Sequence, residues 1–428
     1  MKNNIIKRLI ILCLALAVVL SGTTVSANIV LSKGSVTKYI NTIAHRQMNE
    51  VKNPSHSSAG GEWTVMGLAR AGRITSSYKN IYKNNLKSTL NKTNGILSTV
   101  NYTEYARTVI ALTSIGENPY NFYGYDVISP LAEFDNVIKQ GYNGVAYALI
   151  ALNSGAYDVK PKEGYDGKIG TSDRYKDVLV SAAISTGGWK LFGKKADVDM
   201  TAIALQALAP YYKESKVKTV VDKGLYFLSS KQESSGGFSS MGNENCESSA
   251  QVLTAISTLK ISVKDRRFVK NKNTVLDGLM KFYENGAFKH TEDTLVNQMS
   301  TDQAFYALVA YRNTLANDPP IFNMKKVAVK RKYRKPAKKK NHSKQINKET
   351  TANIAKNINQ ETSTKHKKKE NEKSVNKNDA TTVNIVEETT VNKKPKEDKA
   401  SSWWWIGLII MMIASPAVAY FMFRKRRD

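Results

Sequence analysis

Cysteine is almost absent from this sequence. Its 428 residues include two, Cys13 and Cys246, and Cys13 lies in an N-terminal segment that we expect to be cleaved off. An intrachain disulfide is therefore excluded, and the lack of a Cys-x-x-Cys pair or a His-Cys cluster excludes the usual zinc and redox motifs. We expect Cys246 to be a small residue at a helix start, with a reactive thiol as the alternative.

Acidic residues are scarce compared with basic ones. There are 36 Asp and Glu against 64 Lys and Arg, a net charge of +28. Half of this excess lies in residues 321–400, which hold 23 Lys and Arg, 9 Asp and Glu and almost no aromatic residue. This composition predicts a basic disordered linker over residues 321–402. We expect this linker to attract anionic cell-surface polymers rather than nucleic acid.

Long apolar runs occur only near the two ends of the sequence. Residues 1–27 have a basic start, an apolar stretch and small residues at 25–27, which predict a signal peptide; a retained N-terminal anchor is the alternative. Residues 403–423 are long and apolar enough for one transmembrane helix, and residues 424–428 form a basic tail. No LPxTG-like sorting motif precedes this helix. We therefore expect a single-pass cell-membrane protein of a bacterium, with residues 28–320 extracellular and the C-terminus cytoplasmic.

A recurring unit occupies residues 28–320. It consists of a Gly-containing turn, a polar position and an apolar, Ala-rich helix, and its copies align on Leu68, Val109, Leu149, Leu205, Leu253 and Leu308. Each period is long enough for two helices, and the segments between copies are more amphipathic. Six buried helices alternating with six half-buried ones predict an all-α fold, an α6/α6 toroid, with an open solenoid as the alternative.

Polar residues precede each repeated helix at fixed distances. Six residues before the aligned positions are Glu62, Thr103, Asn143, Asp199, Glu247 and Asp302. Two residues earlier are the N-cap types Gly60, Asn101, Gly141, Asp197, Asn245 and Ser300. The pattern predicts helix caps, with a capping box from Ser300 to Gln303. The inner helices of a ring run parallel, so their N-terminal ends gather at one mouth of the ring. The pattern therefore also predicts a ligand-binding rim there, formed by Glu62, Trp63, Asp197, Asp199, Glu247 and Asp302.

Aromatic residues recur in the turns and on the repeated helices. The set comprises Trp63, Tyr105, Tyr147, Trp189, Phe238 and Tyr306. Core packing is the first expectation for such a set, and the lining of a ligand cavity inside the ring is the second. We expect His45, His56 and His290 to be surface residues, because they are scattered along the sequence.

The glycine-aromatic turns resemble those of the terpenoid cyclase and protein prenyltransferase toroid superfamily, which has prenyltransferase and squalene-oxidase-type repeats. The segment KGLYFLSSKQESSGGF, from Lys223 to Phe238, carries the basic residue, the Gly, the aromatic-Leu pair, the Gln and the Gly-x-aromatic of these repeats. GGW at 187–189 and NGAF at 285–288 are similar. The resemblance covers roughly residues 35–315 and implies the toroid fold.

The resemblance also implies candidate chemistry. DVDMT, at 197–201, is similar to the Asp-x-Asp-Asp-Thr segment of class II terpene cyclases, which implies Asp199 as an acid that protonates an alkene. Met200 replaces the last aspartate of that segment, which argues against cyclase activity. Prenyltransferases bind zinc through a Cys and a His where this sequence has Thr201 and Phe305, so no zinc site is supported.

We therefore favour a non-catalytic surface protein that binds a small ligand or a surface partner. Cobalamin carriers share the toroid, so the ligand can be corrinoid-like as well as simply apolar. Two alternatives stay open: an isoprenoid cyclase or prenyltransferase-like enzyme with Asp199 as its acid, and a structural or adhesive protein. The sequence identifies no cofactor.

Overall fold

The computed structural model describes residues 31–240 and 242–329. This part of the chain is mainly helical, as the sequence predicts. The expected signal peptide, transmembrane helix and basic tail, and nearly all of the expected linker, lie outside the described residues. Within the described ranges, none of the helices has the length and apolarity needed to cross a bilayer.

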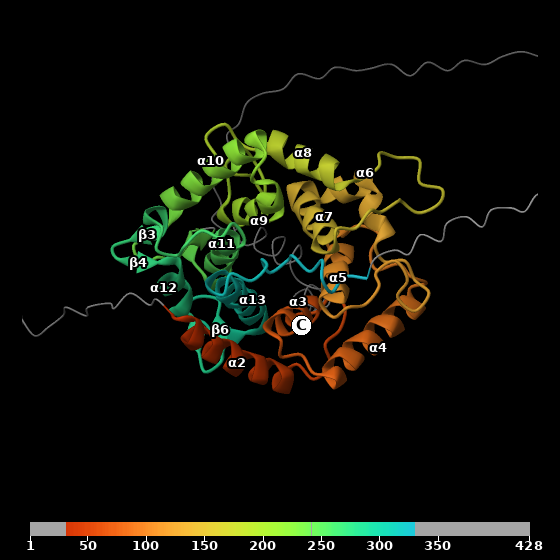
Figure 1. Cartoon of the computed structure of the whole chain (residues 1–428), viewed down its shortest axis with the longest axis horizontal. Coiled ribbons are helices and arrows are strands. Elements are labelled where there is room, and N and C mark those ends of the chain that lie inside the picture. Colours follow the sequence, from red (N-terminus) through yellow and green to blue (C-terminus); the bar gives the residue numbers. More distant parts are fainter. Residues whose placement is uncertain (1–30, 241, 330–428) are drawn as a thin grey trace, which may run out of the picture. The chain divides into compact units, whose positions relative to one another are not determined.

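An inner ring of six helices forms the centre of the described region. These helices are α3 (Glu62–Ala71), α5 (Thr103–Ser114), α7 (Gly141–Gly155), α9 (Val198–Leu208), α11 (Cys246–Thr258) and α13 (Gln298–Leu315). Each contacts the next along the chain, and α13 contacts α3, so the ring is closed (Figure 1). This is the arrangement of an α/α toroid and not of an open solenoid.

An outer layer of helices surrounds the ring (Figure 1). It contains α2 (Lys33–Glu50), α4 (Ser76–Lys92), the short α6 (Phe134–Val137), α8 (Ser172–Ala182), α10 (Ser215–Lys231) and α12 (Val275–Met280). Helix α4 buries one stripe, Tyr78, Tyr82, Leu86 and Leu90, whereas every residue of α11 is buried. The four-residue spacing in α4 and the all-round burial of α11 match an outer and an inner helix, respectively.

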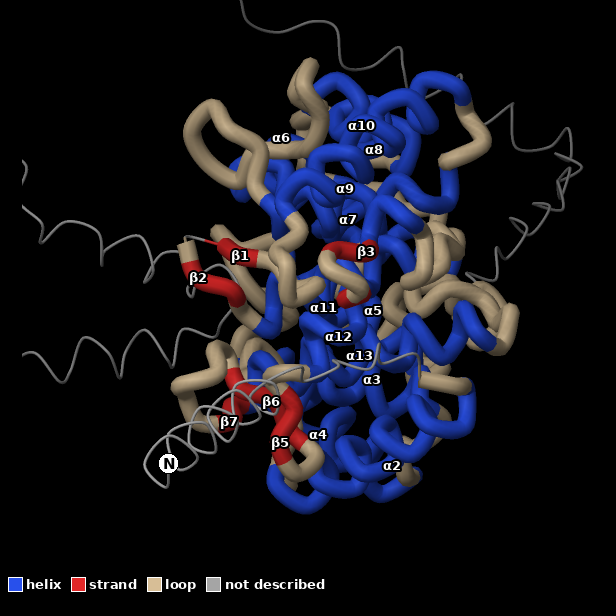
Figure 2. The backbone as a smooth tube through the Cα atoms, turned by 90° about the vertical axis from the view of Figure 1, so that its left-hand side faces the viewer, coloured by secondary structure: helices blue, strands red, loops and turns tan. Residues whose placement is uncertain are grey.

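Short antiparallel strands connect the layers. They are β1 (Ser239–Ser240) with β2 (Asn243–Glu244), β3 (Val269–Lys270) with β4 (Asn273–Thr274), and the sheet β5 (Tyr283–Glu284), β6 (Ala287–Lys289) and β7 (Val296–Asn297). Figure 2 shows β1, β2, β6 and β7 on one side of the ring. Because β2 and β7 lead into α11 and α13, this side carries the N-terminal ends of those inner helices.

The glycine-aromatic turns are attached to the inner helices by the same hydrogen bond in three copies. In each, the aromatic residue's backbone N–H donates to a hydroxyl four residues after the helix N-cap. The pairs are Trp189 with Thr201 (2.9 Å), Phe238 with Ser249 (3.1 Å) and Phe288 with Thr301 (3.0 Å). Glycine is required beside the second turn, because a Cβ at Gly236 would lie 2.0 Å from the Thr274 carbonyl oxygen. The recurring motif therefore has a structural explanation.

The predicted N-caps are confirmed at two inner helices. The side chain of Asp197 accepts a hydrogen bond of 2.8 Å from the N–H of Met200, and Asn245 does the same from Ser248. At the remaining inner helices the predictions are wrong. Gly61, Tyr102, Gln140 and Asn297 precede these helices in place of Gly60, Asn101, Gly141 and Ser300.

The error at α13 changes the position of Asp302. Asn297 accepts from the N–H of Ser300, so the helix starts three residues earlier than predicted and the expected capping box is absent. Asn297 and Ser300 are both N-cap types, and spacing alone did not distinguish them. Asp302 consequently lies in the second turn, deeper than Asp199 and Glu247 lie in their helices.

The chain after α13 folds back across the ring. Figure 1 shows this segment crossing the middle of the inner helices. Ile321 is fully buried, and Phe322 and Met324 are 8% and 1% exposed. Ordered packing thus continues past residue 320, where we placed the start of the linker. The lysines that predicted a linker in this region are preceded by three apolar residues, Ile321, Phe322 and Met324, and these three are buried.

Candidate functional site

Asp302 binds the two ends of the ring together. Its Oδ1 accepts from Gln47 Nε2 at 2.8 Å and Gln298 Nε2 at 2.9 Å, and its Oδ2 accepts from the N–H of Gly60 at 3.1 Å. The hydroxyl of Thr64 also donates to Oδ1. Burial raises the pKa of Asp302 to about 6, although these hydrogen bonds lower it in part. With so many donors, Asp302 is satisfied by the protein itself.

Glu62 is paired with a buried histidine. His56 has a side chain only 5% exposed, and its Nδ1 lies 2.8 Å from Glu62 while its Nε2 lies 3.1 Å from Glu104. Burial alone would lower the pKa of His56, but the two carboxylates raise it to about 9. The expectation of a surface histidine is therefore wrong at position 56. One of its partners, Glu104, is 48 positions away in the sequence, so the pairing could not be read from local spacing.

Glu247 is also paired. Its Oε2 lies 2.7 Å from Nδ1 of His290, and its Oε1 accepts from the hydroxyl of Ser300. The hydrogen bond to Glu247 raises the pKa of His290, which is half-exposed at the surface. Like Glu62, Glu247 has a histidine partner within hydrogen-bond distance.

Asp199 differs from these three acids. Its Oδ1 is buried and has no hydrogen-bond partner among the described residues. Burial, followed by the charges of Asp197 and Glu247, raises the pKa of Asp199 to about 7, while the hydroxyls of Ser248 and Ser240 lower it in part. Asp197 itself is used as the cap of α9. Asp199 is therefore the predicted rim carboxylate with capacity to accept a hydrogen bond or a cation.

Three of the predicted aromatic residues meet inside the ring. The ring centroid of Trp63 on α3 lies 5.7 Å from that of Tyr147 on α7 and 5.6 Å from that of Tyr306 on α13. Burial is the main cause that raises the pKa of both tyrosine hydroxyls, and the charge of Asp199 adds a smaller increase to each. The charge of Arg107 acts against these effects at Tyr147. We call Trp63, Tyr147, Tyr306 and Asp199 the mouth cluster.

The other predicted cavity aromatics lie elsewhere. Trp189 Nε1 donates to the carbonyl of Leu179 on outer helix α8, and Phe238 pairs with Gln232, just after outer helix α10. The hydroxyl of Tyr105 accepts from the N–H of Leu97 in a loop. Trp189 and Phe238 lie in the turns and not on inner helices, and Tyr105 lies on α5 but bonds to a loop through its hydroxyl.

A chain of buried glutamines was not predicted from the sequence. Gln206 Nε2 donates to Gln251 Oε1 at 2.9 Å, and Gln251 Nε2 donates to Gln303 Oε1 at 2.8 Å and to the Tyr306 hydroxyl at 2.6 Å. The chain links α9, α11 and α13 and ends at the mouth cluster. The available signal was a glutamine within each of the three inner helices α9, α11 and α13.

These residues combine a carboxylate that titrates near neutral pH with three aromatic rings. Such a set can hold a cationic group or, with Asp199 protonated, can donate a proton. In the part of the chain that the structure describes, no three His, Cys, Asp or Glu side chains are grouped as metal ligands would be.

Comparison with known proteins finds a structural likeness at low sequence identity. No family model matches the chain, and no curated protein matches it. Among solved structures, the chain is similar to Candida albicans protein geranylgeranyltransferase-I complexed with GGPP, at 12% identity and a TM-score of 0.45. The match covers 69% of this chain and 96% of that one. At this level the likeness carries no conclusion about ligand or reaction.

Proposed function

We propose that the chain is a membrane-anchored cell-surface protein with a prenyltransferase-like toroid. In this proposal the toroid binds a ligand or surface partner at the mouth cluster without transforming it. The observation that carries the proposal is the unpartnered Oδ1 of Asp199, since Glu62, Glu247 and Asp302 are each occupied by protein donors. A buried acceptor without a partner is costly, and a bound donor would remove that cost.

The chemistry of the mouth cluster favours a ligand with a positively charged group on an apolar body. A cation gains from a carboxylate and from the faces of aromatic rings within about 6 Å. Trp63 reaches across the ring from α3 to Tyr147 on α7, so it fills the interior at that level. This packing favours a ligand seated at the mouth over a large corrinoid-like molecule within the ring.

The raised pKa of Asp199 gives the binding and the catalytic hypotheses different pH dependences. Its value of about 7 means that the carboxylate needed to bind a cation predominates above pH 7. Cation affinity should therefore fall as the pH drops below 7, by about tenfold per pH unit at the limit. An alkene-protonating acid would show the opposite dependence, since it must carry a proton, and its raised pKa makes it a weaker acid.

The test is a titration of the full-length protein with benzyltrimethylammonium, followed by calorimetry at pH 6 and pH 8. We expect tighter binding at pH 8 and loss of that gain in Asp199→Asn. Asp173→Asn is the matched control, because the Asp173 side chain is 83% exposed. Equal affinity in the two variants would remove the mouth cluster from the proposal. Native mass spectrometry of protein recovered from its source cells would then identify any ligand directly.

The enzyme alternative has its own experiment. It requires turnover of a linear polyprene or polyprenyl diphosphate by the wild-type protein, increasing below pH 7 and abolished in Asp199→Asn. A product under these conditions would replace the binding proposal.

A further inference from the structure

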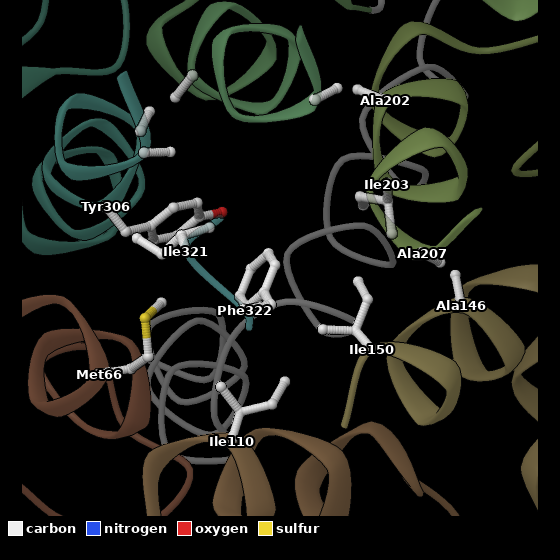
Figure 3. Close-up of a cluster of buried hydrophobic side chains, with 14 of the residues drawn as sticks. Met66, Ile110, Ala146, Ile150, Ala202, Ile203, Ala207, Tyr306, Ile321 and Phe322 are labelled. Atoms are coloured by element: carbon white, nitrogen blue, oxygen red, sulfur yellow. The ribbon is translucent and has the colours of Figure 1, made fainter. Parts of the chain in front are cut away.

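The segment after α13 occupies the end of the ring opposite the N-terminal mouth. Ile321 and Phe322 project among side chains from several inner helices, as Figure 3 shows. The surrounding residues include Met66, Ile110, Ile150, Ile203, Ala207 and Tyr306. The ring centroids of Phe322 and Tyr306 are 6.5 Å apart. The chain thus places an aromatic residue of its own inside an apolar bore.

Few polar contacts hold this segment to the ring. The N–H of Met324 donates to the carbonyl of Ser154 at 2.8 Å, and Arg70 Nη2 donates to the carbonyl of Pro320 at 3.2 Å. At the start of the segment, Asn313 Nδ2 and Arg70 Nη2 donate to the carbonyl of Pro319 at 3.3 and 3.5 Å. No residue of 320–325 belongs to a helix or strand. The segment is therefore held mainly by the burial of Ile321, Phe322 and Met324, which is a non-directional interaction that a similar apolar group can replace.

The fit between the segment and the bore is incomplete. A cavity of about 130 Å3 lies beside Phe322, lined also by Ile150, Asn153, Gln206 and Lys325. The Oδ1 of Asn153 accepts from the hydroxyl of Tyr211 at 2.9 Å, which orients the amide. The Nδ2 of Asn153 is buried and has no hydrogen-bond partner within residues 31–240 and 242–329. The cavity therefore presents an unused donor next to apolar walls.

We infer that residues 319–325 form an intramolecular plug that closes a latent binding site in the ring. The ligand of this site has an apolar body that takes the place of Phe322 and a hydrogen-bond acceptor that pairs with Asn153 Nδ2. The ligand can bind only after the plug withdraws, so the chain blocks its own binding site. The inference does not depend on ligand binding by Asp199, although one residue of the mouth cluster, Tyr306, also borders the bore.

The plug also touches the mouth cluster through one residue. Tyr306 contacts Phe322 on one side and Trp63 on the other. Withdrawal of Phe322 frees space beside Tyr306, which gives a physical route by which the two ends of the ring affect each other. Such coupling is reciprocal: a ligand at one end would change affinity at the other.

Hydrogen exchange of the full-length protein tests whether the plug opens on its own. We expect peptides covering 318–329 to exchange at least about 100-fold faster than buried peptides of α13, because the plug opens without global unfolding. Phe322→Ala should increase exchange at 318–329 about tenfold or more and leave α11 unchanged. Equal exchange of the plug and α13 in the wild-type protein would overturn the inference, since the segment would then be part of the cooperative core.

Octanoate, which has an apolar chain and an acceptor, tests the latent site. Calorimetric titration of the full-length protein in detergent, with protein-free detergent as the blank, should show at least about tenfold tighter binding to Phe322→Ala than to Phe192→Ala. Phe192 is the matched control because it is 44% exposed and lies outside the bore. Asn153→Leu in the Phe322→Ala background should weaken binding about five- to tenfold. Equal affinity of the Phe322→Ala and Phe192→Ala variants would exclude the site.

Discussion

Asp302 and Gln47 are joined by a 2.8 Å hydrogen bond, although 255 positions separate them in the chain. The contact connects the last inner helix to the first outer helix and so lies where the ring closes. A closed ring needs its two ends joined, because an open end would expose the apolar sides of α3 and α13 to water. A buried carboxylate with several donors provides this junction with directional specificity.

Replacing Asp302 by leucine should therefore open the junction. The substitution leaves the Gly60 N–H and the side-chain donors of Gln47, Thr64 and Gln298 without their acceptor, at a cost of about 3–5 kcal/mol. Urea unfolding followed by circular dichroism measures the loss, with the exposed Asp173→Leu as control. A loss below about 1 kcal/mol would show that apolar packing alone closes the ring.

His56 should give the folded protein a pH-dependent stability. Its pKa is about 9 in the folded state against 6.5 for an ordinary histidine. The stabilisation is thus complete below pH 6.5 and is lost as the pH rises through 9. We expect His56→Gln to cost about 3 kcal/mol at pH 6 and much less at pH 9.5, because Glu62 and Glu104 lose a buried cation only where one was present.

The exposed His45→Gln is the control for this measurement. Urea midpoints of the wild-type protein and both variants are compared at each pH. A difference between wild type and His56→Gln that stays constant from pH 6 to 9.5 would contradict the buried imidazolium.

Asp199 should also make the stability fall with rising pH, but in a lower pH range and because its charged form is destabilising. Its folded pKa is raised from 3.8 to about 7, so the folded state holds a proton that the unfolded state has released. Stability therefore falls as the pH rises from about 4 to 7. Asp199→Asn removes the buried charge, and we expect it to stabilise the protein by about 1–2 kcal/mol at pH 8 and hardly at all at pH 4. Urea unfolding at pH 4 to 8 measures this effect. A difference in unfolding free energy between Asp199→Asn and wild type that does not change with pH would show that Asp199 is solvated.

Three hydroxyls accept a hydrogen bond from the backbone N–H of an aromatic residue in a turn, and the three bonds should contribute similarly to stability. Removing the acceptor leaves the buried N–H of Trp189, Phe238 or Phe288 unpaired, at a cost of about 1–2 kcal/mol. The substitutions are Thr201→Val, Ser249→Ala and Thr301→Val, with Thr219→Val on an outer helix as control. Thermal unfolding ranks the four variants, and a control as destabilising as the others would contradict a special role for the turns.

The sequence by itself determined the helices, their alternation and some of their starts. Apolar periodicity distinguishes an inner helix such as α11 from an outer helix such as α4, and Asp197 and Asn245 are local signals whose partners lie three residues away. The spacing also placed Asp199, Trp63, Tyr147 and Tyr306 on inner helices.

Only the tertiary structure decided which acidic side chains have hydrogen-bond donors within the protein and which residues fill the bore. His56 meets Glu104 across 48 positions, and Asp302 meets Gly60 across 242. Such long-range pairs leave no periodic trace in the sequence, because they depend on how the ring closes. The same closure brings Ile321 and Phe322 from a lysine-rich stretch into an apolar bore, since burial is favourable wherever the fold provides an apolar surface.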